Sequence, residues 1–245
     1  MFRPFFTSLL FLLLFSGCGT EESPASRVAG DVRKEIERVR QPVQDFVAQK
    51  IDFAYLLSQD WVDADIMDLQ HKEQEVYATQ LNELRANTPY AYLEIDSLLK
   101  EVSSKQADLA DAAGGFYNHE LFISTILPGG AKQPIGLIHA GMGAEFGGYR
   151  WFKRNLAEMA EEMQEPGWIF LNTDSVGMRM WLQPLPDNQN PLMEHIVSNK
   201  GVPLAALDLW PASYTGSKAD YVQGFIRNIN WDQVEERLQA IRSKS

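Results

Sequence analysis

The only cysteine of the chain, Cys18, stands where its thiol could be chemically modified. It follows a positively charged start and an almost entirely apolar stretch, residues 5–15, that ends in small residues. Such a stretch is typical of a signal segment, because a membrane-spanning helix needs roughly 20 apolar residues. The small residues before the cysteine resemble a bacterial lipobox. The pattern predicts removal of residues 1–17 as a lipoprotein signal peptide and acylation of the Cys18 thiol.

Acylation of Cys18 would attach the protein to a membrane of the bacterial cell envelope. Two or three acyl chains anchor a protein stably, whereas one chain is marginal. The next residue is Gly19 rather than aspartate, so the usual inner-membrane retention signal is missing and the outer membrane is the predicted location. Residues 18–30 are small and polar, which is typical of a tether. The alternative is a plain secretory signal with an incidental cysteine.

The composition limits the classes of partner. A formal net charge of −11 makes nucleic acid and anionic headgroups poor partners. One cysteine excludes an intrachain disulfide. The membrane, through Cys18, and an unidentified envelope protein are therefore the expected partners.

The spacing of apolar residues predicts an α+β fold. Residues 31–51 form an amphipathic pattern, with Pro42 expected to kink or break the helix. Further helices are predicted at 63–85, 93–102, 106–127, 134–143, 148–165, 219–229 and 231–241. The predicted strands are 167–171, its hairpin partner 178–182, and 202–210.

Five short motifs, spread over most of the chain after the tether, support one resemblance. They are Tyr77-Ala78-Thr79-Gln80-Leu81-Asn82, Gly114-Gly115-Phe116-Tyr117-Asn118-His119, Phe146-Gly147-Gly148, Asn188-Gln189-Asn190-Pro191-Leu192 and Asp208-Leu209-Trp210-Pro211-Ala212-Ser213-Tyr214. Together they resemble the iron/manganese superoxide dismutases. The resemblance implies an N-terminal helical hairpin (52–130) and a C-terminal α/β domain (131–245) with a small three-stranded antiparallel sheet. The helix at 31–51 is extra to that fold.

The same resemblance implies a metal site with missing ligands. The family binds iron or manganese through three histidines and one aspartate. His119 takes the second ligand position and Asp208 the third, but Ala212 stands at the fourth. The first position falls on Leu69 or on Gln70, depending on which end of the helix is used for counting. Substitution of residues that only hydrogen bond to the ligands typically reduces metal affinity 10- to 100-fold. The loss of two ligands should therefore reduce it far more.

The resemblance also assigns residues around the metal. Tyr77 takes the catalytic, substrate-gating position, and Gln189, Trp168 and Trp210 surround the site. The glutamate that normally precedes the fourth ligand and reaches across the family dimer is replaced by Pro211. The family dimer interface is therefore doubtful, and its residues could face other partners.

Three functional hypotheses follow. The first is a catalytically inactive envelope lipoprotein, a binding or scaffold module with no cofactor. The second is an active iron or manganese enzyme with rearranged ligands, His119 and Asp208 plus His71 or Gln70. The third is a protein that binds a small ligand in the vacated cavity. A structural alternative is that His119 and Asp208 simply satisfy each other by a buried hydrogen bond.

Overall fold

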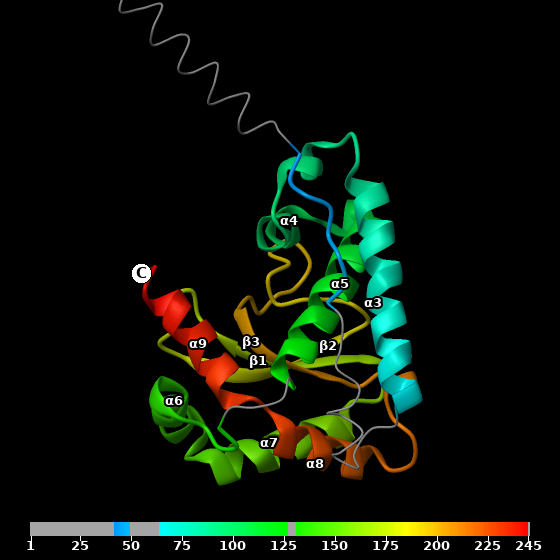
Figure 1. Ribbon diagram of the computed structural model, residues 1–245. Coiled ribbons are helices and arrows are strands. Elements are labelled where there is room, and N and C mark those ends of the chain that lie inside the picture. Colours follow the sequence, from blue (N-terminus) through cyan, green and yellow to red (C-terminus); the bar gives the residue numbers. More distant parts are fainter. Residues whose placement is uncertain (1–41, 50–63, 127–130, 245) are drawn as a thin grey trace, which may run out of the picture. The chain divides into compact units, whose positions relative to one another are not determined.

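The computed structural model describes residues 42–49, 64–126 and 131–244 (Figure 1). The predictions for the signal peptide, Cys18, the tether and residues 31–41 fall outside these ranges. The unit that begins at Pro42 is built from helices and one small sheet. The predicted α+β class is confirmed. Within the described ranges, the helices are too short or too polar for any of them to traverse a lipid bilayer.

A helical hairpin forms the first part of this unit. Helices α3 (Ala64–Arg85) and α5 (Ala107–Thr125) lie side by side in Figure 1. They are joined through η1 (Pro89–Tyr92), α4 (Ile95–Glu101) and η2 (Ser104–Gln106). Apolar side chains of α3, α4 and α5, including Leu81, Leu98 and Phe116, form one buried cluster. This cluster holds α3 against α5, and both helices carry candidate site residues.

A three-stranded antiparallel sheet follows, in the order β2-β1-β3. The strands are β1 (Gly167–Thr173), β2 (Met180–Pro186) and β3 (Val202–Asp208). Every residue of the central strand β1 is buried. Strand β2 extends beyond the predicted 178–182 and includes Pro184 and Pro186. Prolines are tolerated there because β2 is an edge strand, where their missing N–H groups cost no ladder hydrogen bond.

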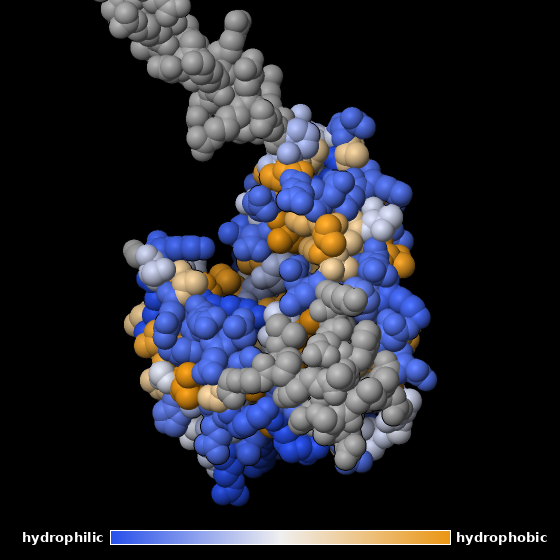
Figure 2. All heavy atoms as spheres, viewed as in Figure 1, coloured by the Kyte–Doolittle hydropathy of each residue, from blue (hydrophilic) through white to orange (hydrophobic). Residues whose placement is uncertain are grey.

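Helices cover both faces of the sheet. Helix α5 lies over one face in Figure 1, and α7 (Tyr149–Glu162) and α8 (Lys218–Asn228) lie under the other. Helices α6 (Gly136–Phe146) and α9 (Trp231–Arg242) complete this part, and the short η3 (Pro211–Ser213) follows β3. The face of the molecule in Figure 2 is mostly hydrophilic, with hydrophobic residues gathered over the helical hairpin.

The prediction of a helix up to residue 51 is wrong for residues 42–49, which have no helical structure. Their backbone bonds to other elements instead. The N–H of Phe46 donates to Asn82 Oδ1 at 2.9 Å, and Asn82 Nδ2 donates to the Phe46 carbonyl at 2.9 Å. The guanidinium of Arg85 donates to the Gln44 carbonyl at 2.9 Å and lies 4.2 Å from the centre of the Phe46 ring. These tertiary contacts replace the hydrogen bonds that a helix would have made within itself.

Candidate metal centre

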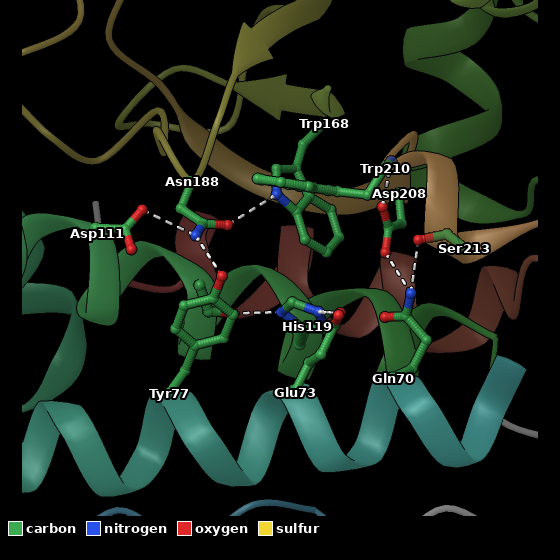
Figure 3. Close-up of polar contacts among 11 residues, drawn as sticks. Gln70, Glu73, Tyr77, Asp111, His119, Trp168, Asn188, Asp208, Trp210 and Ser213 are labelled. Atoms are coloured by element: carbon green, nitrogen blue, oxygen red, sulfur yellow. Dashed lines mark hydrogen bonds and ion pairs between the residues drawn. The ribbon is translucent and has the colours of Figure 1, made fainter. Parts of the chain in front are cut away.

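Helices α3 and α5 and strand β3 bring three of the predicted ligand positions close together, namely Gln70, His119 and Asp208 (Figure 3). The side chain that η3 adds to this site is Ser213. Of the two candidates for the first position, Gln70 is buried with 1% exposure, whereas Leu69 is 37% exposed. One residue along a helix turns the side chain by about 100°, so only one of the two can face the site. The structure places Gln70 there. His71 faces away, with its Nε2 atom 3.5 Å from Glu75 Oε1.

Gln70 and Asp208 are directly hydrogen bonded. Gln70 Nε2 donates to Asp208 Oδ2 at 2.7 Å and to the hydroxyl of Ser213 at 2.7 Å. The other carboxylate oxygen, Asp208 Oδ1, accepts from the backbone N–H of Trp210 at 2.8 Å. Both N–H bonds of the amide and both oxygens of the carboxylate are therefore used within the protein. Asp208 is therefore linked to α3 by a hydrogen bond from a side-chain amide. In the family, a metal ion lies between these two positions.

The charge of Asp208 is held in a buried environment. Complete burial raises the pKa of this carboxyl group, because the charged form loses its hydration. His119, the Trp210 N–H group, Ser213 and Gln70 act in the opposite direction and only partly offset the burial. Asp208 is thus costly as an anion without a cation beside it.

His119 is oriented by α5 itself. Its Nδ1 atom lies 2.7 Å from the Gly115 carbonyl, so Nδ1 carries the hydrogen and donates. In the neutral ring Nε2 then holds a lone pair. Nε2 is buried and makes no hydrogen bond among the described residues, and Glu73 Oε2 lies 3.5 Å away. The hydrogen bond between His119 and Asp208 that one alternative proposed is not formed, since the described partners of Asp208 lie elsewhere.

Asn188 connects the residues around His119, and the sequence reasoning did not single it out. Its Nδ2 donates to the Tyr77 hydroxyl at 2.9 Å and to Asp111 Oδ1 at 3.0 Å. Its Oδ1 accepts from the indole N–H of Trp168 at 3.4 Å. Gln189, which the resemblance placed here, makes hydrogen bonds to the described residues only through its backbone carbonyl and N–H.

The glycine pair of α5 explains how this network fits together. A Cβ atom on Gly114 would lie 1.9 Å from the Asn188 carbonyl oxygen, and one on Gly115 would lie 2.6 Å from the Tyr77 ring. Neither position tolerates a side chain, since real Cβ contacts are never that short. The two glycines therefore let the turn at Asn188 and the ring of Tyr77 approach α5.

The two predicted tryptophans have different roles. Trp168 is fully buried on β1, and its ring centre lies 5.0 Å from that of His119. Trp210 holds Asp208 through its backbone, while its own indole N–H is buried without a hydrogen bond among the described residues. Tyr77 is a second aromatic neighbour of His119, and the centres of the two rings lie 5.5 Å apart.

These residues do not fit the iron or manganese ion of the family. Among the residues that the structure describes, no three His, Cys, Asp or Glu side chains gather into a possible metal cluster. Gln70 presents N–H hydrogens toward Asp208, and hydrogens repel a cation rather than bind it. Ala212 is exposed, and its methyl side chain has no lone pair to offer a metal. The remaining donors are the His119 imidazole, the Glu73 carboxylate beside it, and the Asp208 carboxylate, which is already hydrogen bonded on both oxygens.

Comparison with known proteins gives the family. The C-terminal domain of iron/manganese superoxide dismutases matches residues 134–237. The manganese superoxide dismutase of Thermus thermophilus is 30% identical over 201 residues, which cover 78% of this chain and 96% of that protein. That of Corynebacterium diphtheriae is 29% identical over 199 residues, covering 80% and 98%. The manganese/iron enzyme of a Methylomonas species is 25% identical over 198 residues, covering 77% and 95%. The chain therefore belongs to the iron/manganese superoxide dismutase family.

Proposed function

We propose that this protein is an envelope lipoprotein with the dismutase fold that does not dismutate superoxide and serves as a binding or scaffold module. The observation that carries the proposal is the 2.7 Å hydrogen bond from Gln70 Nε2 to Asp208 Oδ2. It joins α3 to Asp208, at the place where the family has a metal, through a direct hydrogen bond that uses one N–H of Gln70. The family resemblance supports the fold, and a fold does not fix a function.

The free-energy cost of breaking the hydrogen bond between Gln70 and Asp208 opposes the binding of a metal ion. To take up a metal, Asp208 would have to give up the Gln70 N–H that it accepts, and this N–H would then be left buried without an acceptor. An unsatisfied buried polar group costs about 1–3 kcal/mol. No ligand at Ala212 offsets this cost. A metal therefore gains few bonds here and breaks existing ones.

Metal content and activity test this proposal together. The full chain is produced with added manganese and iron, extracted in detergent and purified without chelator. We expect far less than one metal per chain, and no superoxide dismutation above that of the free metal. Near one metal per chain with metal-dependent dismutation would overturn the proposal.

A second candidate is an active enzyme with rearranged ligands. One observation favours it: His119 Nε2 is buried without a hydrogen bond, and the Glu73 carboxylate lies 3.5 Å away. A rotated Gln70 could then free Asp208 as a third donor. This alternative requires that His119→Ala and Glu73→Gln each lose bound metal. Glu75→Gln, two residues further along α3 and roughly 200° round the helix from Glu73, should keep it.

The lipid anchor is a proposal from the sequence around Cys18. Acylation would put the protein in the membrane fraction, and the missing aspartate after the cysteine favours the outer membrane. Cys18→Ser should release the protein from membranes and abolish incorporation of a labelled fatty acid. A Cys18→Ser variant that stays in the membrane fraction would contradict the anchor.

A further inference from the structure

A surface cleft of about 620 Å³ lies along the free edge of β2, away from the candidate metal centre. None of its lining residues belongs to that centre. The residues that matter here are Glu145, Asn155, Asp174, Arg179, Trp181 and Asn199. Apolar side chains of α6, α7 and β2 complete its floor. The cleft thus combines an aromatic ring, amides and charged groups in one cavity.

The aromatic wall of the cleft is held in place. The indole N–H of Trp181 donates to Gln183 Oε1 at 3.4 Å. Gln183 is fixed in turn, because its Oε1 accepts from Asn172 at 2.7 Å and its Nε2 donates to the Asn199 carbonyl at 2.8 Å. A Cβ atom on Gly201 would lie 2.7 Å from the Trp181 ring, so glycine is needed for this close packing. A buried polar network therefore positions both Trp181 and the backbone of Asn199.

The charged groups of the cleft are already paired. Arg179 donates to both carboxylate oxygens of Glu145, at 2.6 and 3.2 Å. Asp174 Oδ1 accepts from the Met178 N–H at 2.7 Å. The three charged side chains sum to one negative charge, so an anionic ligand finds no unpaired cation here. The side-chain amides of Asn155 and Asn199, by contrast, make no hydrogen bond within the described part of the chain.

We infer that this cleft binds an uncharged saccharide. A sugar ring offers a flat face of C–H groups that packs against an indole, while its hydroxyl groups both donate and accept. A fixed Trp181 supplies the apolar face. The two amides each supply a donor and an acceptor at the rim. The inference is independent of whether the metal centre is active.

An extended peptide, which also binds at sheet edges, is a poorer fit. A peptide strand would pair with the outward-facing N–H groups of β2. Prolines in sheets sit where the N–H would point away from the neighbouring strand, so Pro184 and Pro186 remove donors from this free edge. Of β2, only residues 180–182 line the cleft, so the prolines next to them leave only a short edge for an added strand.

Isothermal titration of the full chain, in a detergent without a sugar headgroup, tests the inference. Chitotriose and cellotriose serve as neutral probes, and a trimer of galacturonic acid serves as the anionic one. We expect at least one neutral trisaccharide to bind and the anionic trimer to bind about tenfold more weakly or not at all. Binding of none of them, or equal binding of the anionic trimer, would overturn the inference.

Variants locate the site. Trp181→Ala and Asn199→Ala should each weaken binding about tenfold or more. Asn199 is exposed, so its variant keeps the fold even if the tryptophan variant does not. Trp151→Ala is the matched control, because this tryptophan is 46% exposed on α7 outside the cleft. Binding that survives both cleft variants, or is lost in the control, contradicts the site.

The source of the saccharide is tested by sedimentation with purified peptidoglycan sacculi. Sedimentation that is lost in Trp181→Ala would identify a glycan strand of the envelope as the ligand. Binding of soluble trisaccharide without sedimentation would identify a free sugar. Both results support the saccharide class, and sedimentation that Trp181→Ala leaves unchanged would count against this cleft.

Discussion

Gln70 on α3 and Asp208 at the end of β3 are joined by a hydrogen bond of 2.7 Å, fully shielded from solvent (Figure 3). The family joins these two elements through a metal ion that both contact. Here a side-chain amide makes the connection, and the same nitrogen also reaches Ser213 on η3. These hydrogen bonds tie the helical hairpin to the sheet domain.

Asp208→Asn tests whether this connection is structural. We expect the free energy of unfolding at neutral pH to stay within about 1 kcal/mol of the original, or to rise, because a buried charge is removed. The new amide keeps an acceptor for the Trp210 N–H, and Gln70 can turn its unbonded Oε1 toward the new N–H group. Urea unfolding measures the change.

The control for this substitution is Asp68→Asn, on the exposed side of α3. It removes the same charge without touching the centre. A loss of about 3 kcal/mol or more in Asp208→Asn alone would mean that the carboxylate does more than accept two hydrogen bonds, as in a metal site.

Replacing the lost ligands should restore metal binding. The double variant Gln70→His, Ala212→His supplies two imidazoles beside His119 and Asp208 and removes the competing amide. We expect it to bind manganese measurably more tightly than the original protein, because a set of neutral imidazoles and one carboxylate suits this metal. Metal content after dialysis against equal manganese gives the comparison.

One single variant completes that experiment. Gln70→His alone should gain less than the pair, since one imidazole still leaves the fourth position empty of donors. Equal metal content in the original protein and the double variant would show that the fold around Ala212 no longer allows four ligands to meet.

The sequence predicted the fold well and the site only in part. The motifs around His119 and Asp208 placed both residues at one centre, because they mark the elements that carry them. Counting along α3 could not choose between Leu69 and Gln70, since the two ends of the helix give different registers. Only the packed structure decides, by burying Gln70.

The turn that follows β2 shows a second limit of prediction from the sequence. The matched motif put the side chain of Gln189 among the residues that surround the site, yet Asn188 is the neighbour whose side chain reaches it and contacts Tyr77. The preceding Asp187 has a φ of 51°, an uncommon left-handed conformation for a residue other than glycine. Such a conformation changes which neighbour faces inward, and a residue pattern does not reveal it.

Glu235 should make stability depend on acid. It lies on α9 and accepts from the Leu137 N–H at 3.0 Å and the Ile138 N–H at 2.8 Å, at the start of α6. Burial alone would raise the pKa of this carboxyl group, but these hydrogen bonds and one from Gln239 outweigh it and lower the pKa. The ionised form is therefore stabilised in the folded state.

The sign of the pH effect follows from that lowered pKa. The stabilisation is present above the ordinary glutamate pKa of about 4.3 and is lost as the pH falls through the lower folded value. Glu235→Gln should reduce the free energy of unfolding by about 1–3 kcal/mol at neutral pH, and this difference should shrink in acid. Unfolding curves at several pH values test it, with the exposed Glu236→Gln as control. A difference that is constant with pH would refute the assignment.

Asn82 should hold residues 42–49 against α3. Its side chain makes two hydrogen bonds of 2.9 Å with the backbone of Phe46, in the manner of a neighbouring strand. Asn82→Ala removes both, at about 1 kcal/mol each. Because these bonds join one short segment to α3, we expect local opening of the segment rather than global unfolding. The Phe46 amide should exchange with deuterium about tenfold faster, while amides of the central strand β1 keep their protection.

Gln80→Ala, an exposed position on the same helix, is the matched control. Unchanged exchange at Phe46 would show that Arg85, which also contacts this segment, holds it without Asn82.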